Sequence, residues 1–75
     1  MLTSDLTDIH SAIADRLRNS GLSNVRFEVI PVEAERLACG WNANLLDSQA
    51  LSSDEKRVFI AARFEVMREY SFDGQ

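Results

Sequence analysis

Two stretches of alternating residues decide the fold: residues 24–32, NVRFEVIPV, and residues 37–45, LACGWNANL. In the first stretch, Val25, Phe27 and Val29 alternate with Arg26, Glu28 and Ile30. In the second, the residues on one side are Leu37, Cys39, Trp41, Ala43 and Leu45. A period of two is typical of a half-buried β-strand. We therefore predict two strands that form an antiparallel hairpin.

The segment that joins these strands, residues 32–39, has a second interpretation. Pro31 has no N–H to donate, so the first strand ends there or lies at a sheet edge. Proline is also favoured at the first position of a helix, and VEAERLA at residues 32–38 is rich in helix-forming residues. A short helix that stops near Gly40 is therefore the alternative. We favour the hairpin because the alternation continues to residue 45.

A first helix is predicted before the hairpin. Ser4 is a suitable N-cap, and Asp5 and Asp8 would lie in the first turn, where the helix dipole favours carboxylates. The residues with the spacing of one buried stripe are Leu6, Ile9, Ile13 and Leu17. Gly21 can adopt the left-handed conformation that ends a helix, and Leu22 would then fold back on Leu17.

A second long helix is predicted after the hairpin, over residues 53–70. Ser52 and Glu55 have the spacing of a capping box. Residues 71–75 are expected to form a frayed tail. The predicted fold class is therefore α+β, with one small antiparallel sheet packed against two helices in the order α-β-β-α. Residues 1–75 are expected to form one domain.

Composition excludes several kinds of site. The chain has 75 residues, one cysteine (Cys39) and one histidine (His10), so an internal disulfide or a Cys/His zinc site within one chain is excluded. We expect no metal site. We also expect no cofactor, because the three scattered glycines cannot build a phosphate-binding loop. No apolar run approaches the length of a membrane span, and no secretory signal is visible. A soluble, cytoplasmic protein is expected.

The second helix has an unusually wide apolar face. Its large apolar residues from Phe59 to Tyr70 span an arc of about 160°, wider than that of an ordinary surface helix. They are Phe59, Ile60, Phe64, Val66, Met67 and Tyr70, and Arg63 lies near the middle of the arc. A monomer with two helices and two strands has few other elements that could cover such an arc. We therefore predict a homodimer through Ile60, Phe64 and Met67, with Arg63 at the border of the interface.

Trp41 has two interpretations. On a strand it would join Leu37 and Cys39 in the core, which is the interpretation that the alternation favours. In a loop, flanked by glycine and asparagine, it would be an exposed contact site. We therefore keep Trp41 among the candidate interface residues.

The function predicted from these features is non-enzymatic binding of a protein partner, as an adaptor, regulator or inhibitor of a bacterium or one of its mobile elements. The net charge of −4 disfavours nucleic acid and would steer the protein toward a basic partner. A nucleic-acid-binding domain that uses Arg16, Arg18 and Arg26 is the alternative. A hydrolase built on Cys39 and His10 is a remote third hypothesis, because no residue near Cys39 would activate its thiol.

Overall fold

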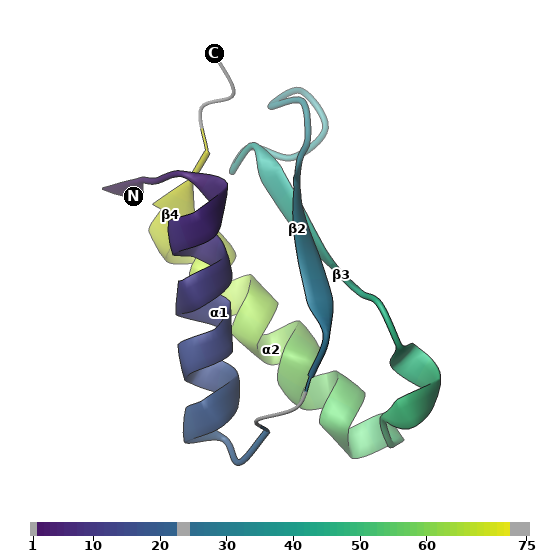
Figure 1. Cartoon of the computed structure of the whole chain (residues 1–75). Helices are drawn as coiled ribbons and strands as arrows, with labels where there is room; N and C mark the ends of the chain where they lie inside the picture. Colours follow the sequence, from purple (N-terminus) through teal and green to yellow (C-terminus); the bar gives the residue numbers. More distant parts are fainter. Residues whose placement is uncertain (1, 23–24, 73–75) are drawn as a thin grey trace.

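The computed structural model describes residues 2–22 and 25–72 and has the predicted order of two helices around a hairpin (Figure 1). The main elements are α1 (Leu6–Asn19), β2 (Phe27–Pro31), β3 (Trp41–Leu45) and α2 (Ser53–Glu69). A short 3₁₀ turn (Ser48–Ala50) precedes α2, and two short strands, β1 (Leu2–Thr3) and β4 (Tyr70–Ser71), pair with each other. The predicted α+β class with the order α-β-β-α is confirmed.

Helix α1 buries the predicted stripe but begins one residue later than predicted. Ile9, Ile13 and Leu17 are at most 2% exposed. The N-cap is Asp5, whose carboxylate accepts a hydrogen bond from the backbone N–H of Asp8 at 2.8 Å. The prediction of Ser4 was wrong because the backbone N–H of Ser4 donates to the Ser71 carbonyl at 2.8 Å, which keeps Ser4 in the extended segment that follows β1.

The end of α1 is the predicted Schellman motif. Gly21 has a φ of +87°, which is the left-handed conformation. Its N–H donates to the Arg18 carbonyl, and the N–H of Leu22 donates to the Leu17 carbonyl at 2.8 Å. These two bonds satisfy carbonyl groups that the end of a helix leaves without partners.

The hairpin pairs β2 with β3 in antiparallel register, with Val29 opposite Ala43. Both strands are shorter than predicted: residues 25, 26 and 32 lie outside β2, and residues 37–40 lie outside β3. Position 24, where the first strand was predicted to begin, lies outside the described residues. Phe27, Trp41 and Ala43 face the helices and are at most 7% exposed, so both helices cover the same face of the sheet.

The segment between β2 and β3 fits neither interpretation completely. Arg36 and Leu37 both donate their N–H groups to the Glu33 carbonyl, which makes one helical turn and not a helix. Gly40 has a φ of +80°, so the extended conformation begins only after it. Its carbonyl accepts the N–H of Val32 at 3.0 Å and closes the hairpin.

Residues 71 and 72 belong to the fold, contrary to prediction. β4 continues directly from α2 and pairs in parallel with β1, with Thr3 opposite Ser71. The N–H of Phe72 donates to the Cys39 carbonyl at 2.8 Å, and Phe72 packs against the core. The expected frayed tail is therefore wrong for residues 71 and 72, and residues 73–75 lie outside the description.

Candidate protein interface

Helix α2 turns only part of its apolar arc toward the core. It begins with the predicted capping box, since Ser52 and Glu55 exchange hydrogen bonds between side chain and backbone. The residues that α2 buries are Phe59, Ala62 and Val66. Burial of a large apolar side chain such as Phe59 stabilises the folded state by roughly 1.5–3 kcal/mol. Met67 and Tyr70 are partly buried against the core, whereas Ile60 and Phe64 remain exposed.

The uncovered part of the arc includes two of the predicted interface residues. Ile60 is 42% exposed and Phe64 is 55% exposed, while Met67 is half-buried. Two neighbouring rows of side chains run along this side of α2 at the helical spacing of four, three and four residues. The first row is Lys56, Ile60, Arg63 and Met67, and the second is Arg57, Ala61, Phe64 and Arg68. We call these eight residues the outward rows of α2.

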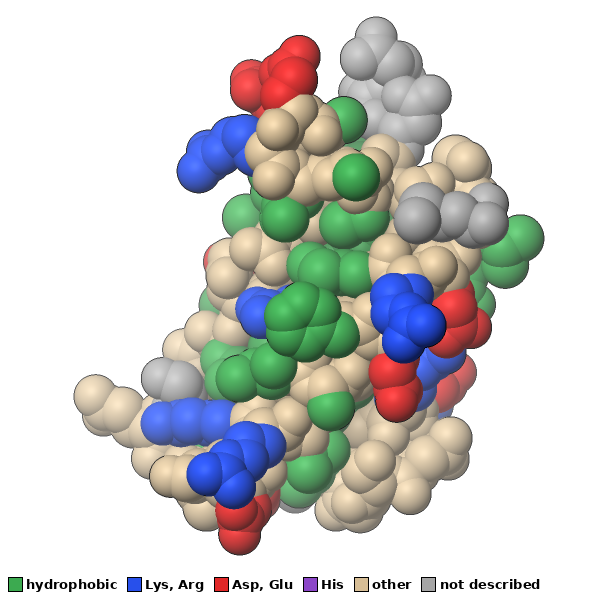
Figure 2. Space-filling model, turned by 180° about the vertical axis from the view of Figure 1, so that it is seen from behind, with side chains coloured by type: hydrophobic (Ala, Val, Ile, Leu, Met, Phe, Trp, Pro, Cys, Tyr) green, Lys and Arg blue, Asp and Glu red, His purple; other side chains and the backbone are tan. Residues whose placement is uncertain are grey.

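The outward rows combine apolar side chains with positive charge only. Four of the eight residues are Lys or Arg and none is Asp or Glu. Figure 2 shows the corresponding side of the molecule, where hydrophobic side chains form a band with Lys and Arg side chains inside it and beside it. Asp54 lies at the start of the helix, 3.8 Å from Arg57. Because both side chains are exposed, this ion pair adds little to the stability of the fold.

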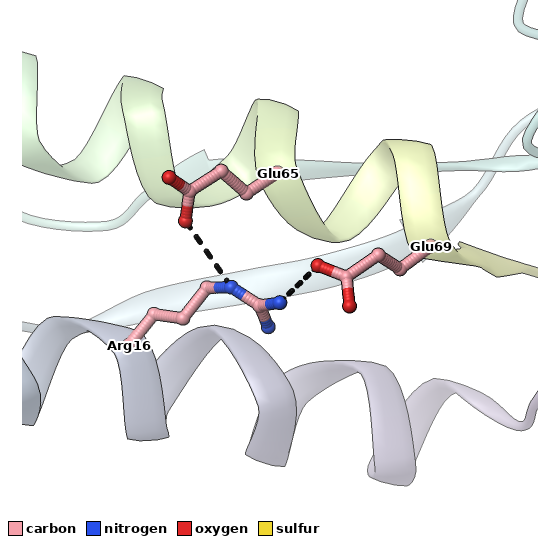
Figure 3. Close-up of polar contacts among 3 residues, drawn as sticks. All are labelled: Arg16, Glu65 and Glu69. Carbon is pink, nitrogen blue, oxygen red and sulfur yellow. Dashed lines mark hydrogen bonds and ion pairs between the residues drawn. The ribbon is translucent and has the colours of Figure 1, made fainter.

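The carboxylates of α2 that follow its first turn point toward α1. Arg16 of α1 lies between them, with its Nε 3.2 Å from Glu65 and its Nη2 donating to Glu69 (Figure 3). The Arg16 side chain is only 26% exposed, so this three-residue cluster ties the two helices together along their shared side. It also places Glu65 and Glu69 on the flank of α2 that faces α1, next to the second of the outward rows.

Arg63 connects the outward rows to the edge of the sheet. Its Nη1 donates to the Ala43 carbonyl of β3 at 3.3 Å, and its guanidinium lies 5.4 Å from the centre of the Phe64 ring. Among the described side chains, its Nε is a buried polar atom without a hydrogen-bond partner. Arg63 therefore fills the space between α2 and β3, and Phe64 forms the outer surface above it.

Trp41 is not part of this surface, contrary to its place among the candidate interface residues. The side chain is completely buried, and its indole Nε1 donates to the Tyr70 carbonyl at 3.2 Å. It therefore holds the end of α2 against the hairpin from inside the core. The strand alternation, which predicted a core position for Trp41, was correct, and the interpretation as an exposed loop residue was wrong.

The three arginines of the nucleic-acid alternative differ in their surroundings. Arg16 is engaged by two glutamates of α2, and Arg18 pairs with Asp15 on the same helix. Arg26 lies just before β2 and is exposed. Two of the three proposed cations are therefore matched by carboxylates of this chain.

Cys39 and His10 have separate partners. Cys39 is 7% exposed, and its thiol donates to the Trp41 carbonyl at 3.2 Å. The His10 ring stacks on Phe27, with 4.2 Å between ring centres. Neither contact resembles the hydrogen-bonded thiol–imidazole pair that nucleophilic catalysis requires.

A groove between α1 and β2 was not predicted. It is lined by one flank of α1, by Leu22, and by Val25 and Phe27 at the start of the hairpin. The residues of α1 that line it are His10, Ser11, Ala14, Asp15, Leu17 and Arg18. No single stretch of sequence indicated this groove, because it forms between two elements, α1 and β2, and neither periodic pattern specifies how they lie beside each other.

Other kinds of site find little support in residues 2–22 and 25–72. No three His, Cys, Asp or Glu side chains in this part of the chain are placed to hold a metal ion. Neither of its two helices has the length and apolarity needed to cross a membrane. Comparison of the chain with protein-family models, curated proteins and solved structures finds no match.

Proposed function

We propose that this protein is a non-enzymatic interaction module, an adaptor, regulator or inhibitor in the cytoplasm, that binds a partner protein through the outward rows of α2. The observation that supports the proposal is the combination of exposed Ile60 and Phe64 with four cations and no carboxylate in these rows. Aromatic residues and arginine are the side chains most enriched at the centres of protein interfaces.

The charge of this surface favours an acidic partner. The whole chain carries a net charge of −4, but the outward rows carry four cations, so the local and overall charges have opposite signs. The basic partner expected from composition alone suits this surface poorly, because charges within about 10 Å dominate at moderate ionic strength. A partner surface with an apolar centre and carboxylates around it would match the rows in both shape and charge.

Self-association through the same surface stays a prediction. A two-fold dimer would place the outward rows of both copies against each other, so eight cations would meet across one contact. A standard interface also needs about 800 Å² on each partner, roughly one sixth of the 5042 Å² surface of this chain. Sedimentation velocity over micromolar concentrations decides the point, since a mass of 8.4 kDa throughout would exclude the dimer.

The proposal is tested by affinity capture with matched variants. The wild-type chain, a Phe64→Ser variant and an Asn44→Ser control are immobilised, because Asn44 is also exposed but lies on the bare face of the sheet. We expect a protein that binds the wild type and the control, but not Phe64→Ser, and that dissociates between about 50 and 500 mM NaCl. The purified complex must show the same pattern, and retention on all three chains would refute the proposal.

A further inference from the structure

The two edges of the hairpin differ in how their main-chain groups are satisfied. Antiparallel partners alternate between pairs that exchange hydrogen bonds and pairs whose N–H and C=O groups point away from each other. Val32 bonds to Gly40 and Leu46 to Arg26, so the bonded pairs fall at even positions. The outward main-chain groups therefore belong to Phe27, Val29 and Pro31 on β2 and to Trp41, Ala43 and Leu45 on β3.

The edge of β3 is largely occupied by this chain. The Trp41 carbonyl accepts the Cys39 thiol, and the Ala43 carbonyl accepts Arg63. The Ala43 N–H donates to the side-chain oxygen of Asn42 at 2.9 Å. A further strand could not pair here without displacing these groups.

The edge of β2 is different. Within residues 2–22 and 25–72, no hydrogen bond outside the ladder reaches the main-chain N–H or C=O of Phe27 or Val29. Pro31 ends the available edge, since it offers a carbonyl but no N–H. The groove between β2 and α1 begins at Phe27 and passes beside Ala14, Leu22 and Val25. An unpaired strand edge and a partly apolar groove thus lie side by side.

We propose that this edge and groove bind an extended peptide segment, which adds to β2 as a third strand and lies beside α1. The outward groups of Phe27 and Val29 supply main-chain donors and acceptors at a spacing of two residues, which only an extended polypeptide matches. Alternate side chains of the segment would enter the groove, where Ala14, Leu22 and Val25 favour aliphatic residues. Asp15 and Arg18 line the same groove and would contact its polar groups.

A second copy of this chain does not fit the same edge. Packed helices lie about 8–10 Å apart, whereas paired strands lie about 4.8 Å apart, so two helices are wider than a two-stranded sheet. We therefore expect α1 to extend beyond β2, and Ser11, Asp15 and Arg18 do line the groove. Pairing β2 with its symmetry mate would place both α1 helices in the same space. A single strand without its own helix avoids this collision.

The test selects peptides from a phage-displayed library of random ten-residue sequences on the full chain. We expect the selected peptides to share β-branched or aliphatic residues at alternate positions and to shift the amide NMR signals of Val29 and Ala14. N-methylation of every second peptide amide should abolish binding when the methylated amides are those that face β2. Methylation of the other set of amides should leave binding intact. Failure to enrich any peptide, or shifts confined to Ile60 and Phe64, would overturn the proposal.

Variants separate this site from the outward rows of α2. Val29→Pro removes an outward N–H but no ladder bond, and it should weaken peptide binding at least about tenfold, whereas Leu45→Pro removes the equivalent group of β3 and should change affinity less than about twofold. Ala14→Arg, which fills the groove without altering the strand, should also abolish binding, and Ala61→Arg should not. Phe64→Ser should keep full peptide affinity. Unchanged affinity in Val29→Pro and Ala14→Arg would refute the site.

Discussion

Gly40 occupies a position that disfavours any side chain, and its replacement by alanine tests the docking of the C-terminal segment. Two features act together there. The backbone is left-handed, with a φ of +80°, and a Cβ would overlap the carbonyl oxygen of Phe72. Gly21 is the matched control, because it has a φ of +87° but nothing within 4 Å of an added Cβ.

The two substitutions should differ in cost. The left-handed conformation costs alanine roughly 1–2 kcal/mol, and this is the whole expected loss for Gly21→Ala. In Gly40→Ala the Phe72 backbone must also move away, which removes its hydrogen bond to Cys39, worth about 1 kcal/mol, and the packing of its half-buried ring, worth about 1–1.5 kcal/mol. We therefore expect Gly40→Ala to lose about 2 kcal/mol more than Gly21→Ala.

The assay is equilibrium unfolding in urea. Trp41 is the one tryptophan and is completely buried, so its fluorescence reports loss of the core. A chain of 75 residues has a stability of about 4–11 kcal/mol, and a loss of this size shifts the midpoint clearly. Equal losses in the two variants would refute the reasoning, because they would mean that Phe72 does not dock against Gly40.

Three further predictions concern the core, a helix cap and the helix pair. The Cys39 thiol should react with a thiol reagent only as fast as the chain opens, since it is 7% exposed, and rapid labelling of the folded protein would contradict its placement. Ser52→Ala should lose about 1 kcal/mol in urea unfolding through the capping box, while Ser53→Ala, one residue inside α2, should lose less than about 0.5 kcal/mol, and equal effects would argue against the cap. Arg16→Gln should lose at most about 1 kcal/mol at low salt and less in 0.5 M NaCl, and a salt-independent loss would mean that packing of the side chain outweighs its charge.

The sequence predicted several features that depend on residues close to one another in the chain. The stripe of α1, its Schellman end and the capping box of α2 depend on contacts between residues close in sequence, and each is present. The hairpin was also predicted, but its second strand starts at Trp41, because the left-handed Gly40 interrupts an alternation that looks continuous in sequence. Strands β1 and β4 have two residues each, too few to produce a period.

The candidate site was predicted only in part, because the sequence pattern of one helix does not specify its contacts with other elements. The arc of α2 indicated that Ile60 and Phe64 would lack cover, and the helical period alone is sufficient for that. It did not show that Arg63 reaches across to β3, since this contact joins residues 20 positions apart. The groove beside β2 was missed because it depends on the lateral placement of α1, which no local pattern specifies.

The most direct test of the proposed docking surface is photo-crosslinking at position 64 in cells that express the protein. The photoreactive residue p-benzoyl-phenylalanine replaces Phe64, and in the control it replaces Asn44 on the bare face of the sheet. We predict an adduct with an acidic protein from position 64, absent from position 44 and suppressed by Ile60→Ser in the same chain. Equal adducts from both positions, or an adduct with a second copy of this chain alone, would contradict binding of an acidic partner through the outward rows of α2.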